Sequence, residues 1–182
     1  MKRCHWVNLA NSLYVRYHDE EWGKPEHDDK KLYEMLILES FQAGLSWECI
    51  LNKRENFRRA FSQFDIDKIL CFTCSDVDRL AADAGIIRNR RKIEAAIANS
   101  LVFKSIQQEW GSFDHYICHF THGETIVEPY NERTTSPLSD EVSKDLRRRG
   151  MKFVGSTTIY ALLQSIGVIN AHGEECDLCP HR

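Results

Sequence analysis

The alternation of apolar and polar residues predicts helices along most of the chain. Its clearest example spans residues 28–43. The apolar positions of that stretch fall at i, i+3, i+4 and i+11, at Leu32, Met35, Leu36 and Ala43. This spacing places the four side chains on one face of a helix. Asp28 or Asp29 can cap the first free amides, and Gly44 can end the helix.

The same periodicity, with capping residues and glycines at the boundaries, predicts seven further helices. They cover residues 47–61, 66–72, 75–85, 89–109, 113–121, 139–149 and 156–167. Ser75 and Asp78 form a plausible capping box for the third of these. Residues 1–27 and 123–137 are typical of loops, and no strand pattern exceeds a few residues. We therefore predict an all-α, compact fold of about eight short helices.

The length of the chain and the distribution of its charge refine this picture. A chain of 182 residues can form one well-buried core but not two ordinary domains, so we expect a single domain over residues 1–182. The net charge is −3, yet two segments are basic. Residues 85–104 and 144–152 each carry five basic residues against one acidic residue, a local charge of +4. Two such segments indicate one positive face.

The cellular setting is inferred from what the sequence lacks. No stretch is long and apolar enough to span a bilayer, and the N-terminus has no apolar core of a signal peptide. The seven cysteines are odd in number and irregularly spaced. These features predict reduced thiols in a cytoplasmic protein that has no membrane partner.

An acidic residue lies on the apolar face of the helix predicted over residues 28–43. A carboxylate among core-facing side chains is costly unless something partners it. Glu39 therefore either forms an ion pair with a Lys or Arg at a structural corner or binds a ligand. Gly44 then frees the backbone, Leu45 lies on a turn, and the next helix begins at Trp47.

Five aromatic residues could enclose this acid: Trp6, Tyr14, Tyr17, Trp22 and Trp47. Aromatic side chains usually belong to a core. Most of these rings, however, lie in the polar N-terminal segment, where a core role is less expected. A stacking pocket closed by one acid is a good receptor for a purine.

Cysteine and histidine residues near both ends of the chain suggest a metal site. Cys4 and His18 lie near the N-terminus, while His172, Cys176 and Cys179 lie near the C-terminus. Two ligands from each end would form a closed tetrahedral zinc site that ties the termini together. The alternative is an incidental free thiol near the N-terminus and a disordered tail.

The turn at residues 83–88 joins two predicted helices. Gly85 can adopt a positive φ there, and the following helix offers unpaired backbone amides to an anion. Arg88 and Lys92 lie close by. These features fit a helix–hairpin–helix phosphate clamp, although a plain corner between two helices has a similar sequence.

Six stretches of the chain form recognisable motifs: residues 3–6, 14–23, 38–39, 42–47, 85–90 and 152–157. In order and spacing they resemble the bacterial DNA-3-methyladenine glycosylase I family. The segments Tyr-His-Asp-Glu-Glu-Trp-Gly and Gln-Ala-Gly-Leu-Ser-Trp are specific to that family, and the resemblance runs nearly end to end. It implies a helix–hairpin–helix DNA glycosylase with a structural zinc ion that joins the termini.

The resemblance assigns residues to each part of such an enzyme. The ligands of one structural Zn²⁺ per chain would be Cys4, His18, His172 and Cys176, with Cys179 as a competitor for the third. The base pocket would consist of Trp6, Tyr14, Tyr17, Glu39 and Trp47, with Glu39 and Tyr17 at the reacting base. The contacts to DNA would be Gly44, Leu45, Gly85, Ile87, Arg88 and Lys92, with Leu45 filling the gap left by a flipped nucleotide.

The implied activity is hydrolytic excision of 3-methyladenine from alkylated double-stranded DNA. 3-Methyladenine is cationic in DNA, so an aromatic cage and a carboxylate suit its recognition. No lysine stands out as a Schiff-base former, which favours a monofunctional enzyme that releases the free base and leaves an abasic site. We also expect a monomer. Two other classes stay open: a zinc-stapled nucleic-acid-binding module without turnover, and a metallohydrolase with an open catalytic zinc.

Overall fold

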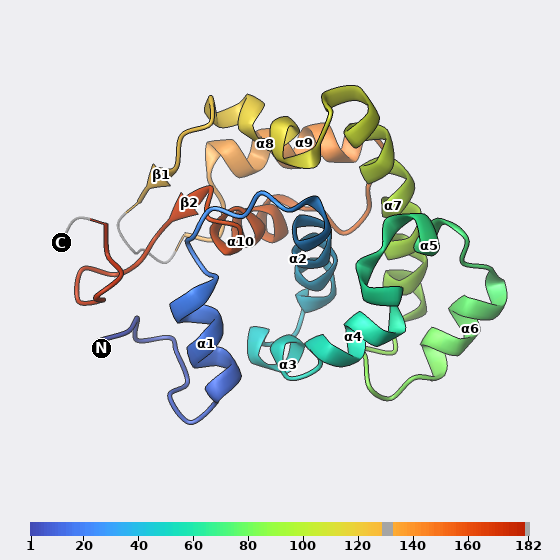
Figure 1. Cartoon of the computed structure of the whole chain (residues 1–182), viewed down its shortest axis with the longest axis horizontal. Helices are drawn as coiled ribbons and strands as arrows, with labels where there is room; N and C mark the ends of the chain where they lie inside the picture. The colour runs from blue at the N-terminus through green and yellow to red at the C-terminus, as the bar shows by residue number, and fades with distance from the viewer. Residues whose placement is uncertain (129–132, 181–182) are drawn as a thin grey trace.

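The computed structural model of the chain describes residues 1–128 and 133–180 and is mostly helical (Figure 1). The helices of this part are α1 (Ser12–Glu20), α2 (Asp29–Gln42), α3 (Trp47–Leu51), α4 (Arg54–Ala60), η1 (Ser62–Phe64, a 3₁₀ helix), α5 (Ile66–Leu70), α6 (Cys74–Ala82), α7 (Arg90–Trp110), α8 (Phe113–Thr121), α9 (Pro137–Arg148) and α10 (Ser156–Ser165). Two short strands, β1 (Ile126–Val127) and β2 (Ile169–Asn170), pair in parallel. The predicted fold class is confirmed as a mostly helical fold, while the expected number of about eight helices is too low.

Helix α2 occupies the centre of the molecule (Figure 1). It contacts α3, α7, α8 and α10. Every residue from Leu32 to Phe41 is buried, including Glu34 and Glu39. The sequence predicts one apolar face, whereas neighbouring helices enclose most of the helix surface. Asp28 caps α2, as predicted, by accepting hydrogen bonds from two amides of its first turn.

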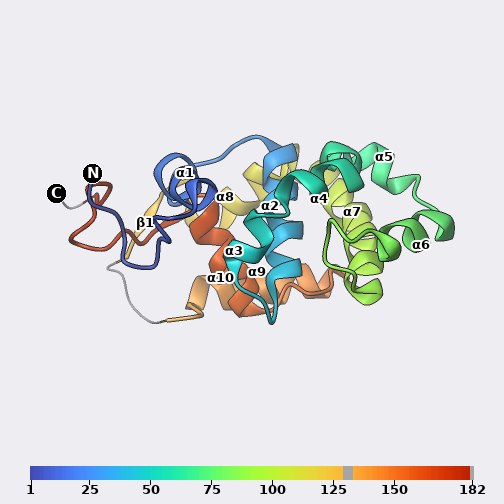
Figure 2. The same ribbon diagram turned by 90° about the horizontal axis from the view of Figure 1, so that it is seen from below.

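The two ends of the chain lie at the same end of the molecule (Figures 1 and 2). Residues 149–155 join α9 to α10, and α10 packs against both α9 and α2. Strand β2 then leads the C-terminal tail toward the N-terminal segment. There the carbonyl of Lys2 accepts a hydrogen bond from the Asp177 amide at 3.0 Å. Within the described residues, no helix is both long and apolar enough to cross a bilayer.

Two predicted boundaries are wrong near the N-terminal half. Helix α1 lies within residues 1–27, which the sequence predicts to be irregular, and Asn11 caps it through its side chain. The helix predicted over residues 47–61 divides into α3 and α4. The division follows Asn52, whose amide bonds back to carbonyls of α3 and closes that helix.

Two further expectations need correction. The capping box of α6 uses Thr73 and Asp76 rather than the predicted serine and aspartate two positions later. The segment 123–137, predicted as a loop, contains β1 and the first residue of α9. Residues 129–132 of that segment lie outside the described residues.

Candidate active site and metal-binding group

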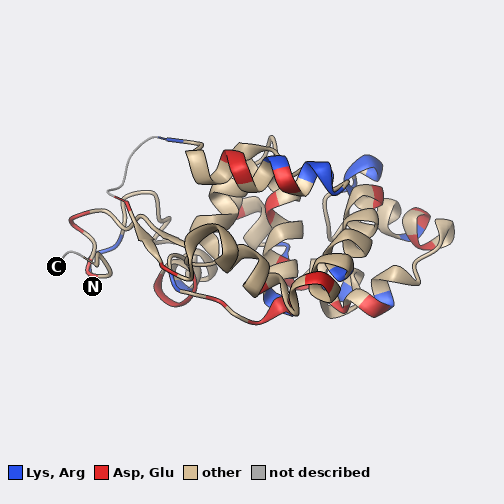
Figure 3. Cartoon of the chain, turned by 90° about the horizontal axis from the view of Figure 1, so that it is seen from above, with Lys and Arg blue, Asp and Glu red and all other residues tan. Residues whose placement is uncertain are grey.

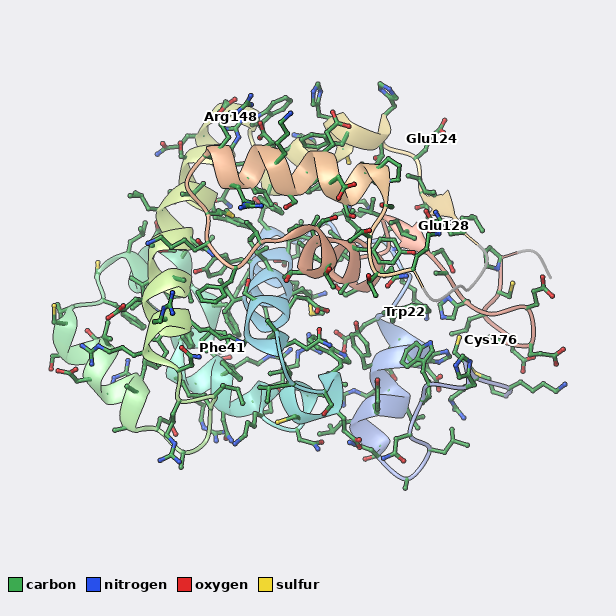
Figure 4. All side chains as sticks on the ribbon, turned by 180° about the vertical axis from the view of Figure 1, so that it is seen from behind. Trp22, Phe41, Glu124, Glu128, Arg148 and Cys176 are labelled. Atoms are coloured by element: carbon green, nitrogen blue, oxygen red, sulfur yellow. The ribbon has the colours of Figure 1, made fainter. Side chains whose placement is uncertain are left out.

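A cavity of about 330 Å³ is lined by residues of α1, α2, α3 and α10. It brings together every residue predicted for the base pocket: Trp6, Tyr14, Tyr17, Glu39 and Trp47. Trp22, which directly follows α1, completes one wall (Figure 4). The candidate site therefore assembles residues that are distant in the sequence.

The aromatic rings of the cavity contact one another. The ring centroid of Trp6 lies 5.5 Å from that of Tyr14 and 4.8 Å from that of Trp22. Across the cavity wall, the centroids of Tyr17 and Trp47 are 5.3 Å apart. Tilted and edge-on contacts of this kind restrict ring orientation. The walls of the cavity are thus formed before any ligand arrives.

Glu39 faces this cavity with an unpartnered carboxyl oxygen. The residue is 3% exposed, and its Oε2 atom has no hydrogen-bond partner among the described residues. The half-buried arginine of α4, Arg54, pairs instead with Glu21 and Glu34. The interpretation of Glu39 as half of a structural ion pair is therefore not supported. Burial raises the pKa of Glu39 to about 8, because the charged form loses its hydration.

A second buried polar atom lies in the same wall. Trp47 Nε1 also lacks a partner among the described residues. Buried polar atoms almost always have partners in folded proteins. An unpaired acceptor and an unpaired donor around one cavity therefore indicate a ligand with complementary groups. Burial also raises the pKa of Tyr17 well above its ordinary value, so its hydroxyl keeps its proton.

Several cavity residues were not singled out from the sequence: Gln42, Arg133, Thr134, Ala161 and Gln164. Gln42 follows Glu39 by three residues on α2, so helical spacing could have identified it. Gln164 follows Ala161 by the same interval on α10. Arg133 and Thr134 come from the loop before α9, which carries no periodic pattern.

Three predicted metal ligands from opposite ends of the chain form one buried group. The ligand atoms of Cys4, His18 and Cys176 all lie within 4.8 Å of one another. Nδ1 of His18 bonds to Asp19 Oδ1 at 2.8 Å, while its Nε2 lies 3.5 Å from Cys176 Sγ. Carboxylates commonly orient metal-binding histidines in this way. This group could hold a metal ion, and Figure 4 shows Cys176 on the tail that reaches the N-terminal segment.

His172, the fourth predicted ligand, lies beside this group. Its ring centroid is 5.1 Å from that of His18. Nδ1 of His172 bonds to Asn170 Oδ1 at 2.9 Å, whereas its buried Nε2 has no partner among the described residues. A buried nitrogen without a partner fits a metal ligand. Cys179 is buried as well but lies outside the group of three.

The sequence matches the family model described as methyladenine glycosylase over residues 6–180. The chain belongs to the methyladenine glycosylase family. It is 44% identical to DNA-3-methyladenine glycosylase 1 of Escherichia coli (strain K12), over 99% of this chain and 98% of that protein. A crystal structure of 3-methyladenine DNA glycosylase I has a TM-score of 0.94 at 42% identity, covering 98% of this chain and 100% of that one. A structure of the Staphylococcus aureus enzyme, which describes 3-methyladenine recognition, has a TM-score of 0.93 at 34% identity, covering 99% and 97%.

In this methyladenine glycosylase, the turn after α2 projects from one edge of the molecule (Figure 2). Gly44 has a φ of +85°, and a Cβ there would meet no atom of the described residues within 4 Å. Leu45 follows with 41% of its surface exposed. The predicted position of Leu45 on a turn is therefore confirmed, and its side chain is accessible from outside.

The turn at residues 83–88 joins α6 to α7, as predicted, but Gly85 does not have a positive φ. Crowding accounts for the glycine instead. A Cβ at this position would lie 2.9 Å from Asp83 Oδ1 and 3.1 Å from the side chain of Asn56. The expected left-handed conformation is thus wrong, and the close approach of this turn to Asn56 on α4 accounts for the glycine.

Lys92 is the predicted DNA contact whose side chain is buried. The residue is 7% exposed, and its Nζ donates hydrogen bonds of 2.8 Å and 2.8 Å to the carbonyls of Phe41 and Ala43. Carbonyls at the end of a helix have no partner within it, so they attract such a donor. In this structure the ammonium of Lys92 thus binds backbone carbonyls instead of pointing outward, which does not support a direct phosphate contact. Arg88 is exposed and Ile87 is half-buried.

Basic residues gather along the edge from which the Leu45 turn projects. Figure 3 shows Lys and Arg on α9 and at the start of α7, along one edge of the molecule. Lys152, in the loop 149–155 between α9 and α10, is exposed. The side chain of Asn99 on α7 holds its backbone through two hydrogen bonds of 2.9 Å. Parts of the two basic segments, in α9 and at the start of α7, thus lie along the same edge.

Proposed function

We propose that this chain flips 3-methyladenine out of alkylated double-stranded DNA and excises it by hydrolysis. The observation that carries the proposal is the unpartnered carboxyl of Glu39 inside an aromatic cavity. A volume of about 330 Å³ lies at the lower end of the range for small-molecule pockets and suits a purine. Aromatic walls favour a flat cationic ring. The names of the relatives support the same substrate.

Glu39 supplies charge complementarity to the base. In the empty cavity its pKa of about 8 favours the neutral carboxyl at pH 7. A cation placed beside the carboxyl favours the anion, so binding of the base releases this proton to solvent. The ionised oxygen then accepts a hydrogen bond from the exocyclic amine of the base, and charge strengthens that bond.

Cleavage of the glycosidic bond then needs little acid catalysis. The electron pair of the C–N bond moves to the cationic base, which leaves as neutral 3-methyladenine. The sugar carbon becomes electron-poor, accepts a water molecule and releases one proton, which leaves an abasic site. Glu39 and Tyr17 are the residues beside the reacting base. No lysine lines the described cavity, which supports a monofunctional reaction.

The DNA contacts are assigned to the positive edge. Leu45, carried by Gly44, would enter the duplex at the gap left by the flipped nucleotide. Arg88, with Gly85 and Ile87 in the same turn, would contact the backbone phosphates. The chain would act as one domain over residues 1–182 and as a monomer, because one chain contributes every part of this site.

One structural Zn²⁺ per chain is proposed at Cys4, His18, His172 and Cys176. When bound, the ion supplies a cross-link between the two ends of the chain. The residues fit this role, because each histidine bonds through Nδ1 to a neighbouring side chain. Nε2 of His18 lies 3.5 Å from Cys176 Sγ, and Nε2 of His172 has no partner among the described residues. Four protein ligands would fill a tetrahedral site, which supports a structural rather than a catalytic ion.

The test is incubation of the wild-type protein with methylated duplex DNA, followed by chromatography of the released bases. We expect free 3-methyladenine from methylated DNA and no base from unmethylated DNA. Binding of methylated duplex without release would identify a nucleic-acid-binding module instead. Loss of release on metal removal from a protein that stays folded would favour the metallohydrolase.

A further inference from the structure

Lys92 lies at the base of the turn that carries Leu45. Its ammonium donates to the carbonyl of Phe41, in the last turn of α2, and to the carbonyl of Ala43, directly before Gly44. The two donor–acceptor distances are 2.8 Å each. The C-terminal end of a helix carries partial negative charge, so a cation is well placed there.

The same lysine connects this turn to the loop 149–155. The ring of Phe153 in that loop lies 6.0 Å from Lys92 Nζ. Two turns further along α7, Asn99 bonds to both backbone groups of Lys152 at 2.9 Å. Helix α7 therefore fixes the position of the loop 149–155 relative to the Leu45 turn.

The turn itself makes few contacts that could fix its direction. In the part of the chain that the structure describes, no atom would lie within 4 Å of a Cβ on Gly44, and Leu45 is 41% exposed. One hydrogen bond crosses the turn, from the Leu45 amide to the Gln42 carbonyl at 2.6 Å. The direction of the leucine must therefore be set largely at the base of the turn, where Lys92 binds.

We infer that Lys92 is a positioning residue that aims the Leu45 turn at the gap left by the flipped nucleotide. The inference rests on the proposed function and gives Lys92 no contact with DNA or with the base. Its side chain instead fixes the carbonyls on either side of Gln42 before DNA arrives. A turn ordered in advance loses less conformational freedom on binding.

Three variants separate this role from charge and from packing. Lys92→Met keeps the unbranched apolar stem but removes the donors and the charge. Lys92→Arg keeps charge and donors. Lys68→Met is the matched control, since it removes an exposed lysine of α5 that pairs with Asp65. Each variant is measured for single-turnover excision, affinity for free 3-methyladenine, and the salt dependence of duplex binding.

We expect Lys92→Met to slow single-turnover excision about tenfold, which corresponds to about 1.4 kcal/mol of activation free energy. Its affinity for free base and its slope of log affinity against log salt should equal those of the wild type. Lys92→Arg should keep most of the rate, and Lys68→Met all of it. If Lys92→Met excises the base at the wild-type rate, Lys92 contributes only packing and the inference is wrong. A slope lower by about one would make it a direct phosphate contact.

A double-mutant cycle with Leu45→Ala tests whether Lys92 acts through the turn. Coupled residues give non-additive effects, so Lys92→Met should add little in the Leu45→Ala background, and additive losses would overturn the inference.

If Lys92→Met does not fold, Lys92→Gln takes its place. A wild-type protein that releases no base would overturn the proposed function alone. Lys92 is then tested on a duplex with an abasic analogue opposite 2-aminopurine, whose fluorescence reports insertion of Leu45. The fluorescence change should be smaller in Lys92→Met than in the wild type, and an equal change would overturn the inference.

Discussion

At the scale of the residue, Glu39 shows how position determines chemistry. The ordinary pKa of a glutamate carboxyl is 4.5. Enclosure within α2 and the surrounding rings raises the pKa of Glu39 to about 8. Oε2 is buried and has no hydrogen-bond partner among the described residues, so a cationic ligand gains from pairing with it. Burial thus makes the ionised carboxyl of Glu39 unfavourable on its own and strengthens its pairing with a bound cationic base.

Replacement of Glu39 by glutamine should weaken the binding of free 3-methyladenine. The amide keeps the size of the side chain but loses the charge and one acceptor. Charge-assisted hydrogen bonds contribute roughly 1.5–3 kcal/mol, so affinity should fall about ten- to a hundredfold. Titration of Glu39→Gln and wild type with the free base measures this. Equal affinities would remove Glu39 from base recognition.

The stability of the protein should also depend on pH through Glu39. The pKa of its carboxyl rises from 4.5 to about 8 on folding. Between these values the folded protein holds a proton that the unfolded chain has lost, so stability declines as pH rises. The slope reaches at most about 1.4 kcal/mol per pH unit. Urea unfolding at pH 5 and pH 8 should show this loss in wild type but not in Glu39→Gln. An equal loss of stability between pH 5 and pH 8 in the two proteins would contradict this role of Glu39.

At the scale of the element, the helices with a continuous apolar repeat could be predicted from the sequence. Helices α2 and α7 begin close to the starts predicted at residues 28 and 89. Helix α1 could not be predicted, because it buries only Tyr17, which lines the cavity, and His18, which faces the other end of the chain. The break between α3 and α4 has no glycine or proline to mark it.

The candidate site was predictable to a different degree. Its aromatic rings and Glu39 carry the motifs of the family, so the sequence identified them. The inward direction of Lys92 depends on how closely the end of α2 approaches α7, which no local pattern reports. Gln164 enters the cavity only because α10 packs on α2. Long-range packing therefore decides what the sequence leaves open.

The close packing of α10 against the N-terminal segment predicts a large effect at Gly167. This glycine has a φ of +73°, and a Cβ there would lie 2.0 Å from the carbonyl carbon of Lys24. Gly167→Ala should therefore lower the free energy of unfolding by about 3 kcal/mol, from backbone strain and overpacking together. Gly123 is the matched control: its φ is +77°, but nothing lies within 4 Å of a Cβ. Gly123→Ala should cost about 1 kcal/mol. Equal losses in denaturant unfolding would mean that the contact relaxes.

At the scale of the whole molecule, the proposed metal group and the cavity share a wall. The ring of His18 lies 5.3 Å from that of Trp6 and is stacked 6.3 Å from that of Trp22, measured between centroids. Both tryptophans line the cavity. The ends of the chain and the base pocket are therefore mechanically connected, and a cross-link at the termini would also stabilise the pocket.

Loss of one proposed zinc ligand should consequently affect metal content, stability and base binding together. Cys176→Ser removes a sulfur of the group of three, so metal per chain, melting temperature and affinity for free 3-methyladenine should all fall. Cys179→Ser is the matched control. This buried cysteine lies outside the group of three, so the variant protein should keep its metal. Metal analysis, thermal melting and titration of the same preparations provide the three readings. His172→Ala decides the fourth ligand, since its buried Nε2 has no other described partner. If Cys179→Ser loses the metal while His172→Ala keeps it, Cys179 replaces His172 as ligand; if Cys176→Ser melts like wild type, the two ends are not joined by a metal.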